Sequence, residues 1–516
     1  MEPPQKRLRV NHDDERPDLL RTLSRPISPP VKSQSLHPRA LKSPWQLTWI
    51  RDLPESLNQD AVTLNDLVGD PLICECWEFN FLHDISFLMA AFDPDTRHLV
   101  QVHIVHGFWK QEDANRTALS GVQIQAAEHE NVKLHVAPMP EMFGTHHSKM
   151  MVLFRHDDTA EIIIHTANMI AKDWTNMTNA VWKSPRLYKS KAATARQDYT
   201  KLPMGSGERF KWDLLKYFEA YDRRQRTCRP LADKLRLYDF SAIRAALIAS
   251  VPGHHKVHDV STTSFGWSGL RNCLKAVPCE KGNAEIVAQM SSIATLGPKN
   301  TWLEKTLFDS LAVSATKNMQ RPKFKLVFPT ADEIRGSLDG YASGASIHTK
   351  TQSAQQAQQL IYLRPILHHW AQGCENGAAD LTEALPSGAV TRDGGRERAA
   401  PHIKTYIRFN EGGSVDWALL TSANLSKQAW GEAVKPTGDM RIASWEVGVL
   451  VWPDLYGEET RMIGTFQTDV PEGTGRLVGL RVPYSMPLQR YGAREVPWVA
   501  TLSHDEPDCH GQRWPG

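Results

Sequence analysis

Two sets of residues with matching spacing, each able to take part in phosphoryl chemistry, stand far apart in this sequence. Each set contains a His-x-Lys triplet, an Asn 21 or 22 residues after the His, and a Trp six residues after that Asn. The first set is His147, Lys149, Asn168 and Trp174, and the second is His402, Lys404, Asn424 and Trp430. One His-x-Lys triplet carries little information, but two with the same spaced Asn and Trp indicate an internal repeat.

These residue types could attack phosphorus without a metal or a cofactor. A neutral imidazole is populated and nucleophilic at neutral pH, so it can attack phosphorus and leave again. With two histidines, one attacks while the other protonates the leaving oxygen and then activates water. Lysine and asparagine donors can hold the non-bridging phosphate oxygens, and one such donor typically lowers a barrier by about 2.7–4 kcal/mol. A lone histidine on a strand is usually a surface or core residue, but the pairing predicts that both sets converge on one site.

Strands must position these residues. Strand-like runs lie at 150–154 and 161–165 after the first triplet, and the pair recurs at 407–420 after the second. His147, Lys149 and Asn168 therefore fall at strand ends, where layered α/β folds place their chemistry. Helical segments alternate with strands, including one capped by Asp84 and an amphipathic one at 302–311. The alternation predicts an α/β sandwich.

The length of 516 residues exceeds one ordinary core and predicts two domains with appendages. Residues 1–44 are rich in Pro, Ser and Arg, a composition that predicts a disordered tail. The first triplet then falls in a domain at 45–240 and the second in a domain at 241–516. Residues 373–398 are Gly/Ala-rich and charged, which predicts a mobile loop before the second triplet.

The tail contains a short basic cluster, formed by Lys6, Arg7 and Arg9. Such a cluster is typical of a nuclear import signal or a nucleic-acid contact, although a solvated charged tail is the plainer interpretation. We expect a nuclear protein.

Composition narrows the classes of protein. Apolar residues make up 41% and charged residues 23%, which is typical of a soluble globular enzyme. No apolar run approaches the roughly 18 residues that span a bilayer, and the N-terminus has no signal-peptide core, so no membrane partner and no secretion are expected. Seven irregularly spaced cysteines favour reduced thiols, and the pair Cys74 and Cys76 has no second pair at zinc-site spacing. A net charge of +2 requires that an anionic partner be held by a local patch.

The motifs resemble the phospholipase D superfamily, and more closely its tyrosyl-DNA phosphodiesterase branch. The similar segments are 143–151, 165–168, 290–292, 295–297, 401–406, 421–427, 446–450 and 496–498. The superfamily usually has an Asp five residues after the motif Lys, whereas Phe154 and Phe409 stand there. The missing Asp disfavours a lipase and fits the phosphodiesterase branch. The similarity spans about residues 45–514.

The resemblance implies two similar α-β-α sandwich domains related by pseudo-two-fold symmetry. It implies hydrolysis of the bond between a DNA 3′ phosphate and a tyrosine, which a stalled type IB topoisomerase leaves behind. His147 would be the nucleophile that forms a covalent phosphohistidine, and His402 would act as general acid and then general base. The phosphate oxygens would be held by Lys149, Lys404, Asn168 and Asn424. The expected partners are DNA with 3′-tyrosyl or other 3′ adducts and a topoisomerase I-derived peptide, with no metal and no cofactor.

Further residues take roles by the same resemblance. Glu446 would orient His147, unless it is a solvent-facing acid, and Asn179 would lie near the other histidine. Phe143 would stack on a DNA base, unless it is a core residue at a strand end. The DNA phosphates would be contacted by Ser291, Ser292 and Thr295, unless these form a plain polar loop.

Two alternatives stay open at this point. A lipid-acting phospholipase should have the motif Asp and a membrane-binding element. A noncatalytic nuclear DNA-binding scaffold should have lost at least one His or Lys of the triplets, and all four are present. Because one chain carries both motifs, a monomer can complete the site.

Overall fold

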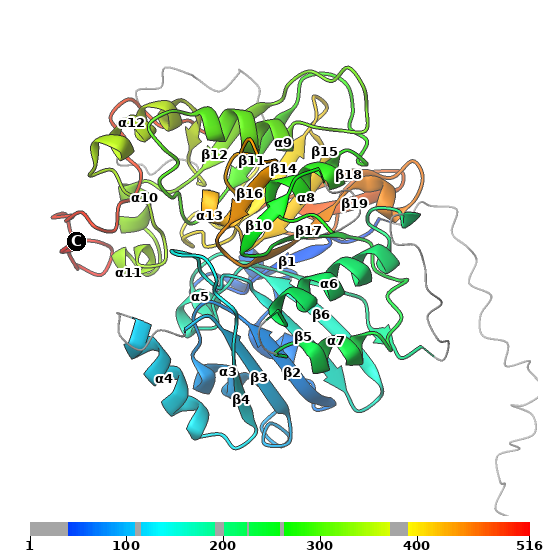
Figure 1. Cartoon of the computed structure of the whole chain (residues 1–516). Helices are drawn as coiled ribbons and strands as arrows, with labels where there is room; N and C mark the ends of the chain where they lie inside the picture. Colours follow the sequence, from blue (N-terminus) through cyan, green and yellow to red (C-terminus); the bar gives the residue numbers. More distant parts are fainter. Residues whose placement is uncertain (1–39, 109–114, 191–200, 224–225, 259–262, 372–390) are drawn as a thin grey trace, which may run out of the picture. The chain divides into compact units, whose positions relative to one another are not determined.

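The computed structural model describes residues 40–108, 115–190, 201–223, 226–258, 263–371 and 391–516. The described residues belong to one compact unit. Its strands form two large mixed sheets with helices against their faces (Figure 1). The predicted α/β architecture is confirmed.

The first sheet is built from the earlier part of the sequence. Its strands are β1 (Trp45–Leu47), β2 (Ile73–Phe79), β3 (Gln101–His106), β4 (Val132–Val136), β5 (Met150–Arg155), β6 (Thr159–His165), β7 (Ala180–Lys183) and β8 (Leu187–Tyr188). Their order is β1-β7-β6-β5-β2-β3-β4, with β8 also paired to β6. Strands β2, β3 and β4 are parallel, and the other neighbours along the path are antiparallel.

The second sheet repeats this arrangement strand for strand. Its strands are β9 (Ala246–Ser250), β11 (Glu285–Gln289), β12 (Lys323–Val327), β13 (Leu367–His368), β14 (Thr405–Phe409), β15 (Ser414–Thr421), β17 (Glu446–Val451), β18 (Arg461–Thr465) and β19 (Leu477–Arg481). The path β13-β12-β11-β14-β15-β17-β9 matches β4-β3-β2-β5-β6-β7-β1 in order and in every strand direction. The second sheet adds β18 and β19, and a separate ribbon pairs β10 (Gly253–Lys256) with β16 (Asp439–Ile442). The prediction of two similar halves is confirmed.

Helices flank both sheets. Those of the first half are α2 (Leu64–Val68), α3 (Ile85–Ala91), α4 (Asn115–Ala127), α5 (Ala171–Thr175), α6 (Gly207–Tyr221) and α7 (Arg229–Leu235). Those of the second half are α8 (Gly266–Leu274), α9 (Asp309–Leu311), α10 (Ala331–Arg335), α11 (Tyr341–Gly344), α12 (Ala354–Leu363) and α13 (Lys427–Trp430). Short 3-10 turns lie at η1 (Glu55–Asn58), η4 (Arg364–Ile366) and η5 (Pro453–Tyr456). Asp84 caps α3 by accepting the Phe87 N–H, as predicted. No helix within the described ranges is both long and apolar enough to cross a bilayer.

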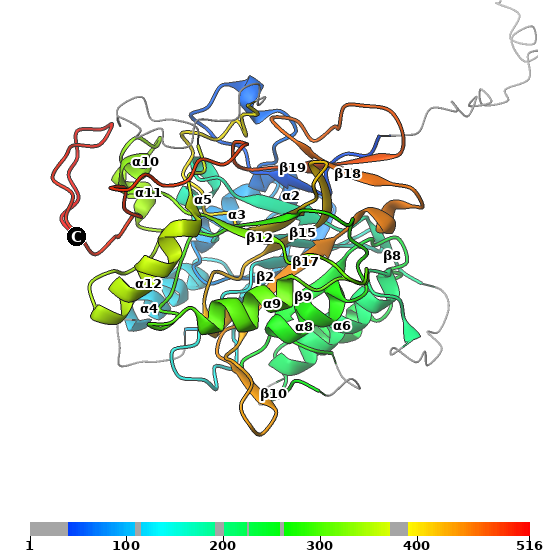
Figure 2. The ribbon, with the colours of Figure 1, turned by 90° about the horizontal axis from the view of Figure 1, so that it is seen from above.

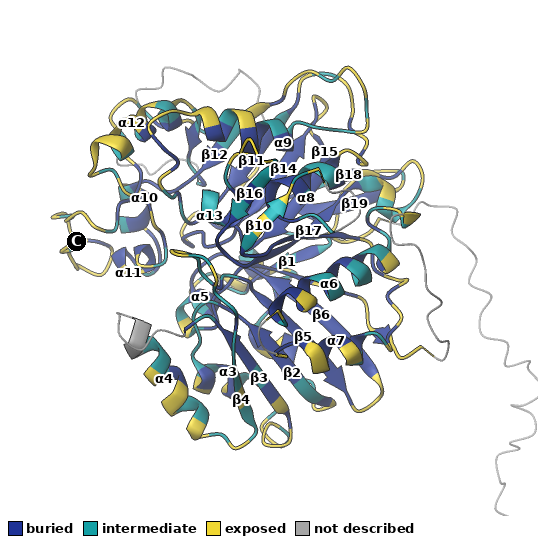
Figure 3. Ribbon diagram, in the orientation of Figure 1, coloured by how far each residue is buried: buried dark blue, intermediate teal, exposed yellow. Residues whose placement is uncertain are grey.

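Alternating side chains of β2 and β5 supply two cores. Trp77 and Met150 face a large core that includes residues of α6, α7 and the second sheet. Cys76 and Met151 face a smaller core that includes residues of α2, α3 and α4. This period of two follows from strand geometry. The central strands β5, β6, β14, β15 and β17 are buried along their whole length (Figure 3).

The boundary predicted near Ser241 falls between the last strand of the first sheet and the first strand of the second. All described residues nevertheless form one compact unit, and the large core is continuous through both halves. The division into domains at 45–240 and 241–516 stays a prediction.

Two predicted loop segments extend too far. Residues 1–39 of the predicted tail, which include its basic cluster, lie outside the described residues. Its last residues are held, because the Leu41 N–H donates to the Leu477 carbonyl and the Ser43 N–H donates to the Asp469 carbonyl. Residues 373–390 of the predicted loop at 373–398 lie outside the described residues. Beyond them, Arg396 is only 1% exposed and donates to the Gly395 carbonyl. Residues 394–396 are buried, so the mobile-loop prediction is wrong there.

The helix predicted at 302–311 has an unexpected form. Leu303–Phe308 is a π-helix, and α-helical residues lie on both sides of it, at 301–302 and at Asp309–Leu311. The Asp309 N–H donates to the Glu304 carbonyl, five residues back, so the turn is wider than an α-turn. Apolar periodicity does not distinguish the two forms, since Leu303 and Leu307 are buried in either. This segment packs beside α8, which lies on β9 (Figure 2).

Candidate active site

Among the main-chain hydrogen bonds between the halves, two each hold a histidine of one half beside a strand of the other. The His147 N–H donates to the Trp445 carbonyl over 3.0 Å, and β17 begins at the next residue. The His402 N–H donates to the Thr178 carbonyl over 2.9 Å, and β7 begins two residues later. Because β7 and β17 occupy the same place in the two sheets, the two connections are equivalent. Each histidine therefore meets residues of the opposite half.

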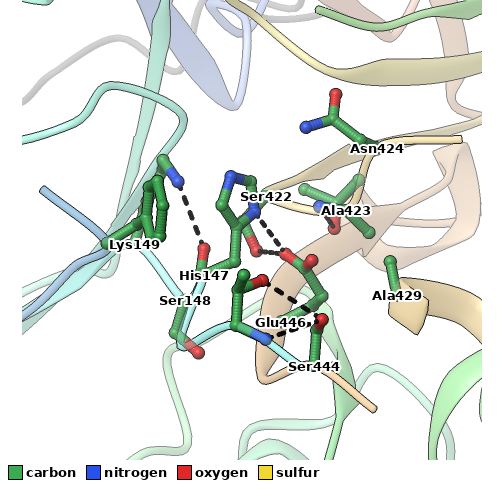
Figure 4. Close-up of polar contacts among 12 residues, drawn as sticks. His147, Ser148, Lys149, Ser422, Ala423, Asn424, Ala429, Ser444 and Glu446 are labelled. Atoms are coloured by element: carbon green, nitrogen blue, oxygen red, sulfur yellow. Dashed lines mark hydrogen bonds and ion pairs between the residues drawn. The ribbon is translucent and has the colours of Figure 1, made fainter. Parts of the chain in front are cut away.

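His147 contacts Glu446. Its Nδ1 lies 2.9 Å from Glu446 Oε2, and the Ser422 hydroxyl donates to the same oxygen over 2.5 Å (Figure 4). An ionised carboxylate only accepts hydrogen bonds, so Nδ1 carries the proton and Nε2 keeps its lone pair. Glu446 is only 4% exposed, so the alternative of a solvent-facing acid is wrong.

His402 contacts two residues of the first half. Its Nδ1 lies 3.2 Å from Asn179 Oδ1 and 3.1 Å from Asp173 Oδ2. The orientation of Asn179 is fixed, because Oδ1 accepts from the Thr166 hydroxyl over 2.8 Å and Nδ2 donates to the Asp173 main-chain carbonyl over 2.8 Å. All these side chains are buried.

The two lysines fold back onto their own triplets. Lys149 Nζ donates to the His147 carbonyl over 3.2 Å. Lys404 Nζ donates to the His402 carbonyl and lies 3.2 and 3.3 Å from the two nitrogens of that imidazole. Both lysines are 0% exposed. The structure thus places an ammonium group directly against each histidine.

Burial works against charge on both lysines. It lowers the pKa of Lys149 to about 8, and the negative charges of Glu446, Asp173 and Glu78 oppose this effect. It lowers the pKa of Lys404 well below its usual 10.5, and the positive charge of Lys149 lowers it further. The two ammonium groups thus disfavour one another, so an anion bound beside them would favour the charged form of both lysines.

Burial also keeps both histidines neutral. It lowers the pKa of His147 to about 4, although the adjacent Glu446 opposes the shift. It lowers the pKa of His402 well below its ordinary value, and Lys404 and Lys149 add to the effect. His147 is also among the groups whose charge lowers the pKa of His402. A neutral imidazole is the nucleophilic form.

The asparagines take different environments. Asn424 Oδ1 accepts the N–H groups of Ser291 and Ser292, at 3.2 and 2.9 Å, so its NH₂ group points the other way, to the side of His147 (Figure 4). Asn168 is buried, and its Oδ1 has no hydrogen-bond partner within the part of the chain that the structure describes. The Asn168 main-chain N–H donates to Asp173 Oδ2 over 2.7 Å.

The residues expected to contact DNA are only partly at the surface. Phe143 is 84% exposed, so the core alternative is wrong. Its φ of 60° lies in the left-handed region that residues other than glycine rarely adopt. Ser291 is buried, with its hydroxyl 3.3 Å from Asn424 Oδ1, so it positions Asn424. Ser292 is half-buried, and Thr295 is exposed and accepts from the Gln356 amide.

The repeated tryptophans are structural. Trp174 Nε1 donates to the Asn168 carbonyl over 3.0 Å, and Trp430 Nε1 donates to the Tyr406 hydroxyl over 3.1 Å. Both rings are buried. They mark the repeat without entering the site.

Sequence reasoning missed Asp173, which contacts His402. The available signal was its place directly before the repeated Trp174, where the second set has Ala429 before Trp430. Ser422 and Thr166 were also missed as supports of Glu446 and Asn179, although they stand at equal places, two residues before each Asn.

The chain resembles known proteins in sequence and in fold. The family model described as tyrosyl-DNA phosphodiesterase matches residues 44–492. The chain is 32% identical to the probable tyrosyl-DNA phosphodiesterase of Schizosaccharomyces pombe, across 92% of this chain and 96% of that protein. It is 28% identical to tyrosyl-DNA phosphodiesterase 1 of Arabidopsis thaliana, across 92% of this chain and 77% of that one. The crystal structure of the yeast tyrosyl-DNA phosphodiesterase has a similar fold, with a TM-score of 0.61 at 20% identity over 90% of this chain and all of that one.

The buried neutral histidines predict that acid destabilises the fold. Burial lowers the pKa of His165 to about 3, and an unfolded histidine has a pKa of about 6.5. Below pH 6.5 only the unfolded state takes up this proton, so the free energy of unfolding falls by roughly 1.4 kcal/mol per pH unit for such a group. We expect His165→Leu to reduce the slope of unfolding free energy against pH between 6.5 and 5 by about one proton. Urea unfolding at several pH values measures this slope, and His156→Gln, a substitution of an exposed histidine, is the matched control. Equal slopes for His165→Leu and the unaltered protein would contradict the prediction.

Proposed function

The chain belongs to the tyrosyl-DNA phosphodiesterase family, and from that premise we propose that it is a DNA repair phosphodiesterase. Its proposed substrate is DNA whose 3′ phosphate is joined to a tyrosine of a topoisomerase I-derived peptide. The observation that carries the proposal is the crossed contact of the two histidines, His147 with Glu446 and His402 with Asn179 and Asp173. Each motif is completed by the half of the chain that carries the other.

In the first step, His147 attacks phosphorus. Glu446 holds the proton on Nδ1, so the lone pair of Nε2 forms the bond to phosphorus while the bond to the tyrosine oxygen breaks. The leaving phenolate takes a proton from His402. His402 is neutral in the free site, but the negative phosphodiester favours its protonated form, so the acid arises when substrate binds.

In the second step, His402 becomes the base. Having given up its proton, it accepts one from water, whose oxygen then attacks phosphorus while the bond to His147 breaks. The products are a 3′ phosphate on the DNA and an enzyme restored to its starting state. Throughout, Lys149 and Lys404 balance the charge on the non-bridging oxygens, and the amides of Asn168 and Asn424 donate to them. The charges of this step are met by side chains, so we propose that no metal takes part.

The DNA side of the site includes the exposed ring of Phe143. An aromatic ring that faces outward can stack on any base, which typically contributes about 1–3 kcal/mol. Ser292 and Thr295 can contact phosphates, whereas Ser291 acts through Asn424. Contacts of this kind position DNA without reading its sequence.

The experiment that tests the function is cleavage of a 3′-tyrosyl oligonucleotide in EDTA. We expect release of tyrosine and a 3′-phosphate product, because all the acid, base and charge-stabilising groups are side chains. His147→Ala is the matched control and should remove cleavage. DNA binding without cleavage, with or without Mg²⁺, would favour the scaffold alternative, and cleavage that requires Mg²⁺ would overturn the metal-free mechanism.

The two-step chemistry predicts that His402→Asn traps an intermediate. This substitution removes the base that activates water, so release should slow more than attack, and a DNA-linked protein should accumulate. Mass spectrometry of the digested protein should place the adduct on His147. Adduct on another residue, or normal turnover without adduct, would contradict the roles of the two histidines.

We further propose that the protein acts in the nucleus as a monomer, and that other 3′ adducts joined through oxygen are cleaved at the same site. The basic cluster of Lys6, Arg7 and Arg9 supports a nuclear address, and the presence of both motifs in one chain supports a monomer. Replacing the three basic residues by Ala in a fluorescent fusion should reduce nuclear accumulation, and unchanged accumulation would remove this address.

A further inference from the structure

A second carboxylate, that of Asp173, lies against the imidazole of His402. Its Oδ2 is 3.1 Å from His402 Nδ1, and the side chain is 0% exposed. The Asn168 N–H fixes Oδ2 from the other side over 2.7 Å. Oδ1 has no hydrogen-bond partner among the residues that the structure describes. The carboxyl group is thus both buried and aimed at one titratable side chain. Burial raises the pKa of Asp173 above its ordinary value, whereas the Asn168 N–H and the positive charges of Lys404, Lys172 and Lys149 act against this shift and favour the carboxylate.

The repeat shows that this carboxylate is specific to one half. Glu446 has Asn179 as its structural counterpart, because both stand beside the paired residue that precedes β17 or β7. Both side chains also accept from the hydroxyl two residues before the motif Asn, Ser422 in one half and Thr166 in the other. Position 173, in contrast, corresponds to Ala429, five residues after Asn424. His147 therefore contacts a carboxylate, that of Glu446, at the start of a strand, whereas His402 contacts only the amide of Asn179 at the equivalent place.

We infer that Asp173 is the positioning residue that orients His402 and stabilises its charged form, the part that Glu446 plays for His147. The inference rests on the proposed function, in which His402 must carry a proton at one stage and lose it at another. The amide of Asn179 can accept the Nδ1 proton but brings no charge. Asp173 brings the charge, and its place on α5 compensates for the amide at the strand position.

The surroundings of His402 make such an anion necessary. The groups that act on its imidazole are Lys404 on the same strand end, Lys149 and His147 from the first triplet, and Lys172 on α5. All four disfavour a charged imidazole, whereas the negative charge of Asp173 favours it. The same carboxylate also opposes the loss of charge from Lys149 and Lys404. Without Asp173, the groups named here that act on His402 would all be cationic or neutral.

A purely structural role is the competing explanation, because Asp173 also accepts the Asn168 N–H. The chain offers a way to separate the two. Asn179 Oδ1 is 3.2 Å from the same nitrogen of His402 but does not contact the Asn168 N–H. A carboxylate moved to position 179 would restore charge to His402 without restoring the contact to Asn168.

The test compares Asp173→Asn, Asn179→Asp and the double variant that carries both. We expect Asp173→Asn to slow breakdown of the His147 adduct by about 10²-fold or more, in the range of general acid–base effects. In the double variant, adduct breakdown should be at least tenfold faster than in Asp173→Asn. Equal rates for Asp173→Asn and the unaltered protein, or no recovery in the double variant, would overturn the inference. If Asp173→Asn does not fold, Asp173→Glu replaces it in the test, because this substitution keeps the carboxylate. Adduct breakdown that is slowed as much in Asp173→Glu as in Asp173→Ala would then overturn the inference.

A second measurement does not depend on turnover. Nitrogen-15 NMR of labelled histidines reports the protonation of His402 in the free protein. Removing the anion should lower the pKa of His402 in Asp173→Asn, and the double variant should raise it again. If the unaltered protein cleaves no 3′-tyrosyl DNA, the proposed function fails while this titration still decides the role of Asp173; an unchanged titration in all variants would refute that role.

Discussion

The site depends on two crossed main-chain pairings, His147 with Trp445 and His402 with Thr178. Neither half can complete its motif from its own residues, because the partner of each histidine side chain follows directly after the pairing in the other half. The close approach leaves no space for a larger residue at Gly144, where a Cβ would lie 2.0 Å from the Ala443 carbonyl oxygen. The continuous core and the rigid strands on both sides hold these pairings in place. The way the halves join thus gives each histidine a partner side chain from the opposite half, which is the arrangement that the proposed mechanism requires.

Burial sets the electrostatics of the site. The four basic side chains of the two triplets are largely buried, and burial lowers the pKa of each one. The carboxylates of Glu446 and Asp173 offset part of this cost. The result is a free site that holds fewer protons than its basic groups could carry. An incoming phosphodiester supplies the missing negative charge and so favours proton uptake where an acid is needed.

Several of these features were predictable from sequence, and the reasons differ by residue. His147, Lys149, His402 and Lys404 stand out because their spacing repeats, and the strands after them stand out because apolar runs show strand patterning. Glu446 and Asn179 required the family resemblance, since neither lies near its histidine in the sequence. Contacts that join the halves leave no local pattern, so the use of the Ser291 and Ser292 N–H groups to hold Asn424 was not predictable. The π-helical turn at Leu303–Phe308 was missed because burial periodicity is shared by both kinds of helix.

The differences between the halves are more informative than their similarity. Topology, triplets, asparagines and the supporting hydroxyls of Ser422 and Thr166 are all shared. The carboxylates are not, since one lies on β17 and the other on α5. Two histidines with identical surroundings would have equal proton affinities, and neither would be committed to attack or to proton transfer. In the proposed mechanism one imidazole is a nucleophile and the other an acid and base, so a symmetric fold needs asymmetric charges. The different placement of Glu446 and Asp173 is an asymmetry of this kind.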